Sequence, residues 1–245
     1  MKYVEVFPNS GSLYQTVAAR IVGQARDAVE RRGRFTMVLA GGSTPRRLYS
    51  LLANDFREVF PWADSHFFWG DERHVPPDHP DSNFRMAWEA MLSLVPVPAS
   101  NLHRIRAEEA DPHCAADQCG TEIREFFQLA DHEFPRFDLV LLGLGPDGHT
   151  ASLFPSTEAL HVHDRLAAAN WVPKLNAFRI TMTLPVFNHS ACVDFVVQGE
   201  DKAEALHAIL EGERQPDRYP AQAIQPADGD LYWSVDAPAA GLCHR

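Results

Sequence analysis

Short apolar segments, each followed by a polar loop that begins with glycine, are the feature that most restricts how this chain can fold. Phe35–Ala40 and Phe137–Leu142 are apolar almost throughout, and His66–Trp69 is similar. A strand that is apolar on both faces must be covered on both faces, as in a parallel sheet flanked by helices. Further strands are predicted at Phe178–Leu184, Cys192–Val197 and Leu231–Val235.

Between these segments lie stretches with the periodicity of amphipathic helices. Apolar residues recur every four positions from Leu13 to Val29, which predicts a helix over residues 12–31 that ends at Gly33. Further helices are expected after Pro45, after Ser82, over residues 121–129 and over residues 203–210.

The alternation of strands and helices predicts an α/β fold: a three-layer, mostly parallel, Rossmann-like sheet with helices on both faces. Neither a repeat nor a long linker interrupts the pattern, so residues 1–245 are interpreted as one domain. In such sheets, ligands bind beyond the carboxyl ends of the strands. The polar loops 41–45, 70–85 and 143–155 are therefore expected to converge on one edge.

Composition excludes several classes of function. The 245 residues carry a formal net charge of −11, which argues against a nucleic-acid partner. No apolar run reaches the ~20 residues needed to span a bilayer, and Met1–Ser10 does not resemble a signal segment. The four cysteines form no CxxC pair, so they are interpreted as free thiols of a cytoplasmic protein. The oligomeric state is left open, with a monomer favoured.

The loop Gly41–Pro45 has two possible interpretations. Its glycines, hydroxyl groups and following helix N-terminus suit a phosphate group. It could equally be a tight turn with Pro45 in the first helical position and Ser43 or Thr44 as the cap. It is not a P-loop, because no Gly-Lys-Ser/Thr follows, nor a serine-hydrolase elbow, because Pro45 replaces the second glycine.

The segment Gly143–Gly148 matches GxGxxG, but residues 156–173 offer no clean strand of the kind a dinucleotide site requires. A nicotinamide cofactor is therefore disfavoured. His149 follows these glycines directly and could accept a proton from water near neutral pH. Asp147 could orient its imidazole, although a single histidine among 12 is more often structural.

Charged residues elsewhere are open to an ordinary interpretation and a functional one. Asp71, together with Glu72 and Arg73, could form a solvated surface loop. Arg179 and Lys202 could be surface charges or, facing the loop 41–45, a phosphate clamp. HExxH spacing and a paired Cys/His set are both absent, so no metal is expected.

In four blocks the sequence resembles the 6-phosphogluconolactonases, and the resemblance covers nearly the whole chain. The blocks are Gly41–Pro45, Gly70–Arg73 with Asp81–Arg85, Gly143–Pro155, and Arg179–Pro185. That family hydrolyses a phosphorylated sugar lactone, 6-phosphoglucono-δ-lactone, to 6-phosphogluconate in the oxidative pentose phosphate pathway, without metal or organic cofactor.

The resemblance implies a role for each candidate residue. His149 would be the general base for water, with Asp71 and Asp147 setting the geometry. The substrate would be held by Gly42, Ser43, Thr44, Arg73, Arg179 and Lys202.

Two other functions are compatible with parts of the sequence. The glycine loop and the Asp-Gly-His segment are also similar to those of the glucosamine-6-phosphate deaminase/isomerases. That resemblance implies a carboxylate in the segment after the histidine, where this chain has Phe154. A phenylalanine cannot transfer a proton, so this alternative ranks second. A catalytically silent sugar-phosphate sensor ranks third, because no functional group is missing from the candidate site.

Overall fold

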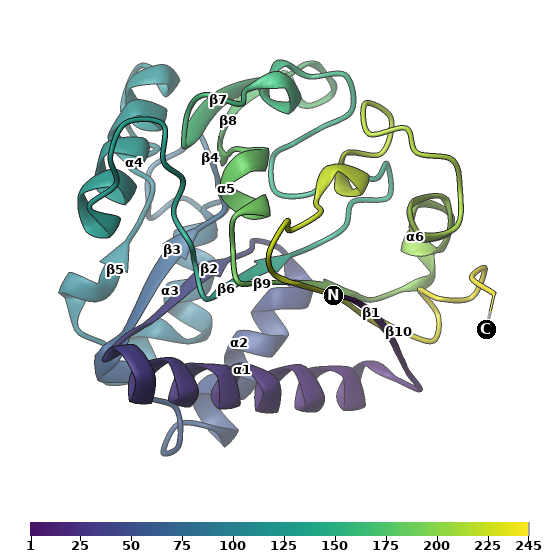
Figure 1. Ribbon diagram of the computed structural model, residues 1–245, viewed down its shortest axis with the longest axis horizontal. Coiled ribbons are helices and arrows are strands. Elements are labelled where there is room, and N and C mark those ends of the chain that lie inside the picture. The colour runs from purple at the N-terminus through teal and green to yellow at the C-terminus, as the bar shows by residue number, and fades with distance from the viewer. Residues whose placement is uncertain (245) are drawn as a thin grey trace.

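The computed structural model, in which residues 1–244 are described, is built around a seven-stranded parallel sheet (Figure 1). The strand order is β1-β10-β9-β6-β2-β3-β5, and every neighbouring pair runs parallel. The strands are β1 (Lys2–Phe7), β2 (Phe35–Leu39), β3 (Ser65–Trp69), β5 (Leu102–His103), β6 (Leu139–Leu142), β9 (Cys192–Val197) and β10 (Asp230–Asp236). The predicted parallel α/β sheet is confirmed.

Helices cover both faces of this sheet, as expected. In Figure 1, α1, α2 and α3 lie on one side, and α4, α5 and α6 lie on the other. The helices are α1 (Ser10–Arg32), α2 (Ser43–Asp55), α3 (Asn83–Ala90), α4 (Pro112–Phe127), α5 (Leu184–Asn188) and α6 (Ala203–Leu210). Short 3₁₀ helices lie at Trp62–Asp64, Leu92–Leu94, Ala99–Asn101, Glu158–His161, Pro173–Leu175, Glu200–Lys202 and Pro220–Ala223.

A second, three-stranded antiparallel sheet was not predicted. It has the order β4-β8-β7, from β4 (Asp71–Arg73), β8 (Ala177–Met182) and β7 (Ala167–Val172). The strand expected at 178–184 forms, but in this sheet, and Arg179 lies inside it rather than at its start. β7 also lies within residues 156–173, where no clean strand was expected. Its sequence Ala-Ala-Ala-Asn-Trp-Val has weak β-propensity, so its pairing with β8 determines its conformation.

The two sheets join at Gly70, between β3 and β4. The Gly70 N–H donates to Leu39 O at 3.0 Å, and its carbonyl accepts from the Met182 N–H at 2.8 Å. One residue therefore links the end of β2 in the large sheet to the end of β8 in the small one.

The helix boundaries confirm some local predictions and correct one. Gly33 ends α1 in the left-handed conformation (φ 73°), and the Ser82 side chain caps α3 by accepting from the Arg85 N–H. The prediction for α2 was wrong: Gly42, with φ 107°, is the N-cap, and no side chain caps the helix. Pro45 is thus the third helical residue, because the glycine turns the chain two residues earlier than predicted.

None of the helices within residues 1–244 is both long enough and apolar enough to cross a membrane.

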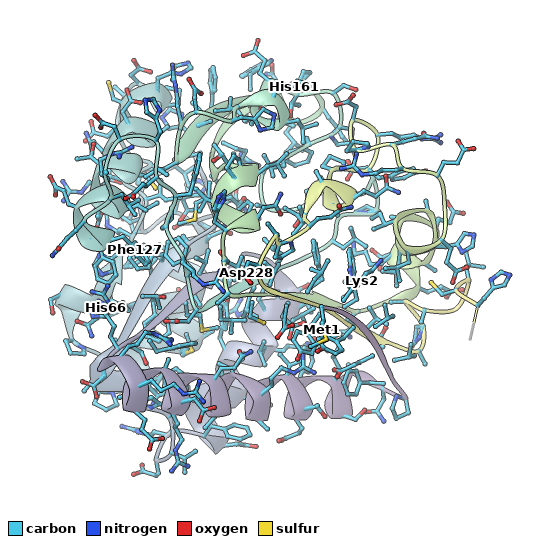
Figure 2. All side chains as sticks on the ribbon, viewed as in Figure 1. Met1, Lys2, His66, Phe127, His161 and Asp228 are labelled. Carbon is cyan, nitrogen blue, oxygen red and sulfur yellow. The ribbon has the colours of Figure 1, made fainter. Side chains whose placement is uncertain are left out.

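Two histidines and a glutamate form a chain of side-chain contacts at the β5 edge of the large sheet. His66 Nδ1 lies 3.1 Å from His103 Nε2, and His103 Nδ1 lies 3.0 Å from Glu122 Oε1. His66 also lies close to Phe126, in the region where Figure 2 places His66 and Phe127. Burial, reinforced by the neighbouring His103, lowers the pKa of His66 to about 4.

We predict that the His66→Gln variant loses less stability than the wild type as the pH falls from about 6.5 to 4. In that window the unfolded chain binds a proton on His66 that the native state excludes, so the wild type is destabilised by acid. The difference should be on the order of 1 kcal/mol after solvent screening. Urea unfolding at several pH values measures it. The His163→Gln variant, which alters an exposed histidine, should retain the wild-type slope; identical slopes for His66→Gln and wild type would contradict the assignment.

Candidate active site

Loops from four adjacent strands meet at one edge of the large sheet. The strands β9, β6, β2 and β3 are neighbours in the large sheet. From β2 the chain adds β3 and β5 on one side and then returns to place β6 on the other side, so the direction of strand addition reverses at β2. Such a switch point leaves a crevice between loops that run in opposite directions. A cavity of about 230 Å³ opens there, lined by Ala40, Gly41, Gly42, Asp71, Arg73, Gly143, Leu144, Gly145, Pro146, His149, Thr150, Ala151 and Lys202.

The glycine loop is held in place by contacts on both sides, and at Gly41 they leave no room for a side chain. A Cβ on Gly41 would lie 1.9 Å from Asn83 Oδ1 of α3. On the other side of the loop, the buried Tyr49 hydroxyl accepts from the Ala40 N–H at 2.8 Å and donates to the Ala40 carbonyl at 2.9 Å. These contacts set the position of the α2 N-terminus, whose first N–H groups have no partner inside the helix.

Asp71 is a buried carboxylate in the wall of the cavity. Its side chain accepts from Ser152 Oγ at 2.6 Å and from Asn83 Nδ2 at 3.3 Å, and the residue is only 7% exposed. The interpretation of this segment as a solvated loop is therefore wrong. Glu72 is buried as well. It accepts hydrogen bonds from the N–H groups of Asn83 and Phe84, which holds this segment against the start of α3.

His149 and Asp147 form an oriented pair. His149 Nδ1 lies 2.5 Å from Asp147 Oδ1, and Lys174 Nζ donates to Asp147 Oδ2 at 2.8 Å. The hydrogen bond with His149 holds the pKa of Asp147 well below its usual range, with Lys174 contributing in the same direction. An ionised carboxylate can only accept, so Nδ1 must carry the proton. In the neutral ring, Nε2 is then the free acceptor, and it has no hydrogen-bond partner among residues 1–244.

The imidazole plane is fixed by packing as well. Phe154 stacks on His149 with ring centroids 4.0 Å apart and planes 17° from parallel. On the glycine side, a Cβ at Gly145 would lie 2.0 Å from His149 Nδ1. The ring is therefore held between the phenyl group and the backbone of its own loop.

Two guanidinium groups lie on neighbouring strands of the small sheet. Arg73 of β4 pairs directly with Arg179 of β8, and neither forms a salt bridge within the described part of the chain. Burial, with the charge of Arg73, lowers the pKa of Arg179. Like charges placed opposite each other destabilise a sheet, so this pair is a place where an anion would be stabilising. Lys202 lines the same cavity from the β9 side.

The structure thus brings together five of the nine predicted site residues in the lining of one cavity: Gly42, Asp71, Arg73, His149 and Lys202. Asp147 contacts His149, and Arg179 adjoins Arg73. Ser43 and Thr44 are not in the lining; Ser43 is exposed and Thr44 half-buried at the start of α2.

Sequence reasoning missed four supporting residues. Asn83, Ser152 and Lys174 hold the two aspartates, and Phe154 packs on His149. Asn83 and Ser152 lie within two of the four blocks that carry the family resemblance, so the sequence could have indicated that they belong to the site. Lys174 lies in the turn between β7 and β8, and nothing in the sequence indicates its role. Within residues 1–244, no group of three His, Cys, Asp or Glu side chains gathers at this cavity in a way that could hold a metal ion.

We predict that ¹⁵N chemical shifts of His149 will show the neutral ring protonated on Nδ1. The ionised Asp147 enforces this tautomer, so the preference should weaken in the Asp147→Ala variant and persist in the His163→Gln control. A neutral wild-type ring protonated mainly on Nε2 would show that Asp147 does not orient it.

Comparison with known proteins identifies the family of this chain. The sequence pattern of the family described as glucosamine-6-phosphate isomerases/6-phosphogluconolactonase matches residues 8–233. The chain is 44% identical to a 6-phosphogluconolactonase of Synechocystis over 96% of both chains, and 43% identical to one of Nostoc over 97% of both. A crystal structure of 6-phosphogluconolactonase from Thermotoga maritima superposes with a TM-score of 0.82 at 30% identity, covering 96% of this chain and all of the other. The chain therefore belongs to the glucosamine-6-phosphate isomerase/6-phosphogluconolactonase family.

Proposed function

We propose that this protein hydrolyses 6-phosphoglucono-δ-lactone to 6-phosphogluconate, with His149 as the general base. The observation that carries the proposal is the His149–Asp147 pair, which leaves Nε2 free in a ring that lines the cavity. Full-length similarity to relatives named 6-phosphogluconolactonase supports the choice of substrate.

The chemistry needs one base and a positioned water. Nε2 takes a proton from water as the water oxygen bonds to the lactone carbonyl carbon, giving a tetrahedral intermediate. The bond from that carbon to the ring oxygen then breaks, and the imidazolium returns the proton to the departing oxygen, which becomes a hydroxyl group. Asp147 stabilises the transient positive charge on His149, as the carboxylate partner of a catalytic histidine does in other hydrolases. General-base assistance of this kind contributes roughly 10²–10⁴-fold.

Cations in the cavity wall and beside it suit the phosphate end of this substrate. Arg73 and Arg179 offer planar donors on adjacent strands, and Lys202 offers a point charge from another direction. The α2 N-terminus after Gly42 adds unpaired N–H groups and a partial positive charge. Anchoring the phosphate here would orient the lactone carbonyl toward His149.

Phe154 favours hydrolysis over the isomerase alternative. Opening an amino-sugar ring calls for a proton donor near the base, and here the ring stacked on His149 is a phenyl group. A solved monomeric glucosamine-6-phosphate deaminase shares the fold, with a TM-score of 0.81, but at 19% identity that likeness concerns the fold alone.

Replacement of the base provides the first activity test. The His149→Ala variant should retain its fold and lose at least a hundredfold in kcat. Acid release from freshly generated 6-phosphogluconolactone, corrected for spontaneous hydrolysis, measures it. The His163→Ala control should keep wild-type activity, and a folded His149→Ala enzyme with near-normal turnover would remove His149 from the mechanism.

The second test concerns phosphate recognition. The wild type should prefer the phosphorylated lactone over unphosphorylated gluconolactone by at least a hundredfold in kcat/KM, because charge-assisted hydrogen bonds contribute about 1.5–3 kcal/mol each. The Arg179→Met variant should narrow this ratio about tenfold or more while leaving activity on gluconolactone nearly unchanged. The Arg26→Met variant, altered on the exposed side of α1, is the matched control. Equal activity of the wild type on both lactones would refute the phosphate site, and ammonia release from glucosamine 6-phosphate would reinstate the isomerase.

A further inference from the structure

A cluster of nitrogen, oxygen and sulfur donors lies away from the candidate active site, where the C-terminal tail meets α6. His207 and Glu211 are four residues apart and project from the same side of the end of α6, and Cys243 and His244 belong to the tail. Figure 1 shows this end of the chain beside α6. None of the four residues lines the cavity that contains His149.

Three of these four side chains have donor atoms close enough to share one ion. One ligand atom each from His207, Glu211 and Cys243 lies within 4.8 Å of the others. Glu211 Oε2 is 3.3 Å from His207 Nδ1 and 3.0 Å from His244 Nδ1. The two imidazoles lie nearly parallel, 17° apart, with centroids separated by 6.1 Å. Both imidazoles thus lie against the same carboxylate oxygen of Glu211.

One buried nitrogen of this cluster is left without a hydrogen-bond partner. His207 Nδ1 is buried and has no hydrogen-bond partner, because its contact with Glu211 lacks hydrogen-bond geometry. A buried polar atom left unpaired costs about 1–3 kcal/mol. The tail is nevertheless folded onto the helix, with the His244 N–H donating to Glu211 Oε1 at 2.7 Å.

We propose that His207, Glu211, Cys243 and His244 bind one divalent transition-metal ion of the Zn²⁺ class. Two imidazoles, a carboxylate and a thiolate are four ligands of the types that Zn²⁺ takes in tetrahedral sites. The thiolate and the carboxylate together neutralise the charge of a divalent ion, which suits a half-buried site. Tetrahedral bonds of about 2.0–2.3 Å require the donors of His207, Glu211 and Cys243 to close in by only about 1 Å. The exposed His244 side chain, already 3.0 Å from Glu211, would complete the set by rotating toward them.

Such an ion would join the tail to α6 and leave the chemistry at His149 untouched. Because the unfolded chain holds these ligands apart, the ion would bind mainly to the native state and stabilise it by mass action. Chelation is therefore expected to lower Tm without lowering lactone hydrolysis, so failure of the proposed catalytic function would not affect this site.

The test uses the full chain, stripped of metal by a chelator and dialysed, with Zn²⁺ and Co²⁺ alone as probes. One equivalent of Co²⁺ should produce thiolate-to-metal charge-transfer absorption, and calorimetry should give 1:1 binding of Zn²⁺. At a hundredfold excess of Zn²⁺ over Kd, Tm should rise by roughly 5–10 °C. The Cys243→Ser variant should lose the charge-transfer band and most of the Tm shift. The Cys114→Ser variant, which changes an exposed thiol on α4, should keep both.

His207→Gln provides a second variant on the helix side of the site and should weaken Zn²⁺ binding at least tenfold. The proposal is overturned if the wild type binds no stoichiometric metal, if Co²⁺ binds without the thiolate band, or if Cys243→Ser and His207→Gln both bind Zn²⁺ as tightly as the wild type.

Discussion

The parallel pairing of β2 with β3 on one side and β6 on the other is the constraint from which the site follows. All five residues of β2 are buried, so this strand must lie in the interior of the sheet. Parallel neighbours require crossover connections, and those connections place α2 and the other helices over the faces. They also bring the carboxyl ends of β2, β3, β6 and β9 to the same edge. The cavity lies at this edge, between the loops that follow these strands.

Close backbone approaches then convert this edge into a site of defined shape. Gly41 lies against Asn83, Gly145 lies against the His149 ring, and a Cβ at Gly148 would lie 2.7 Å from Tyr219. At each point a side chain from one segment occupies the space that a Cβ would need, so the segments lock together. Asn83 also forms a hydrogen bond with a polar group of the site, because its Nδ2 donates to the Asp71 carbonyl at 2.9 Å.

The sequence predicted the large sheet and most of its elements because strong local signals agreed with the tertiary fold. Cys192–Val197 and Ala203–Leu210 were placed with their observed bounds. The small sheet was missed because β4 consists of three charged residues and half of β7 is alanine, so only tertiary pairing makes them strands. His149 was predictable from its place after a buried strand. Its stacking on Phe154 and the hydrogen bond from Lys174 to Asp147 could not be predicted, because they depend on tertiary contacts and not on a local sequence pattern.

The division between the two sheets has a consequence for selectivity. His149 extends from the large sheet, whereas Arg73 and Arg179 belong to the small one, and Gly70 joins the two. The distance between the proposed base and the proposed phosphate anchor therefore depends on the geometry of the junction at Gly70. A Cβ at Gly70 would approach Val38 Cγ1 to 3.3 Å and Phe187 to 3.6 Å, so the junction resists enlargement. The length of a ligand held between this base and this anchor would therefore be set at Gly70, which is not part of the cavity lining.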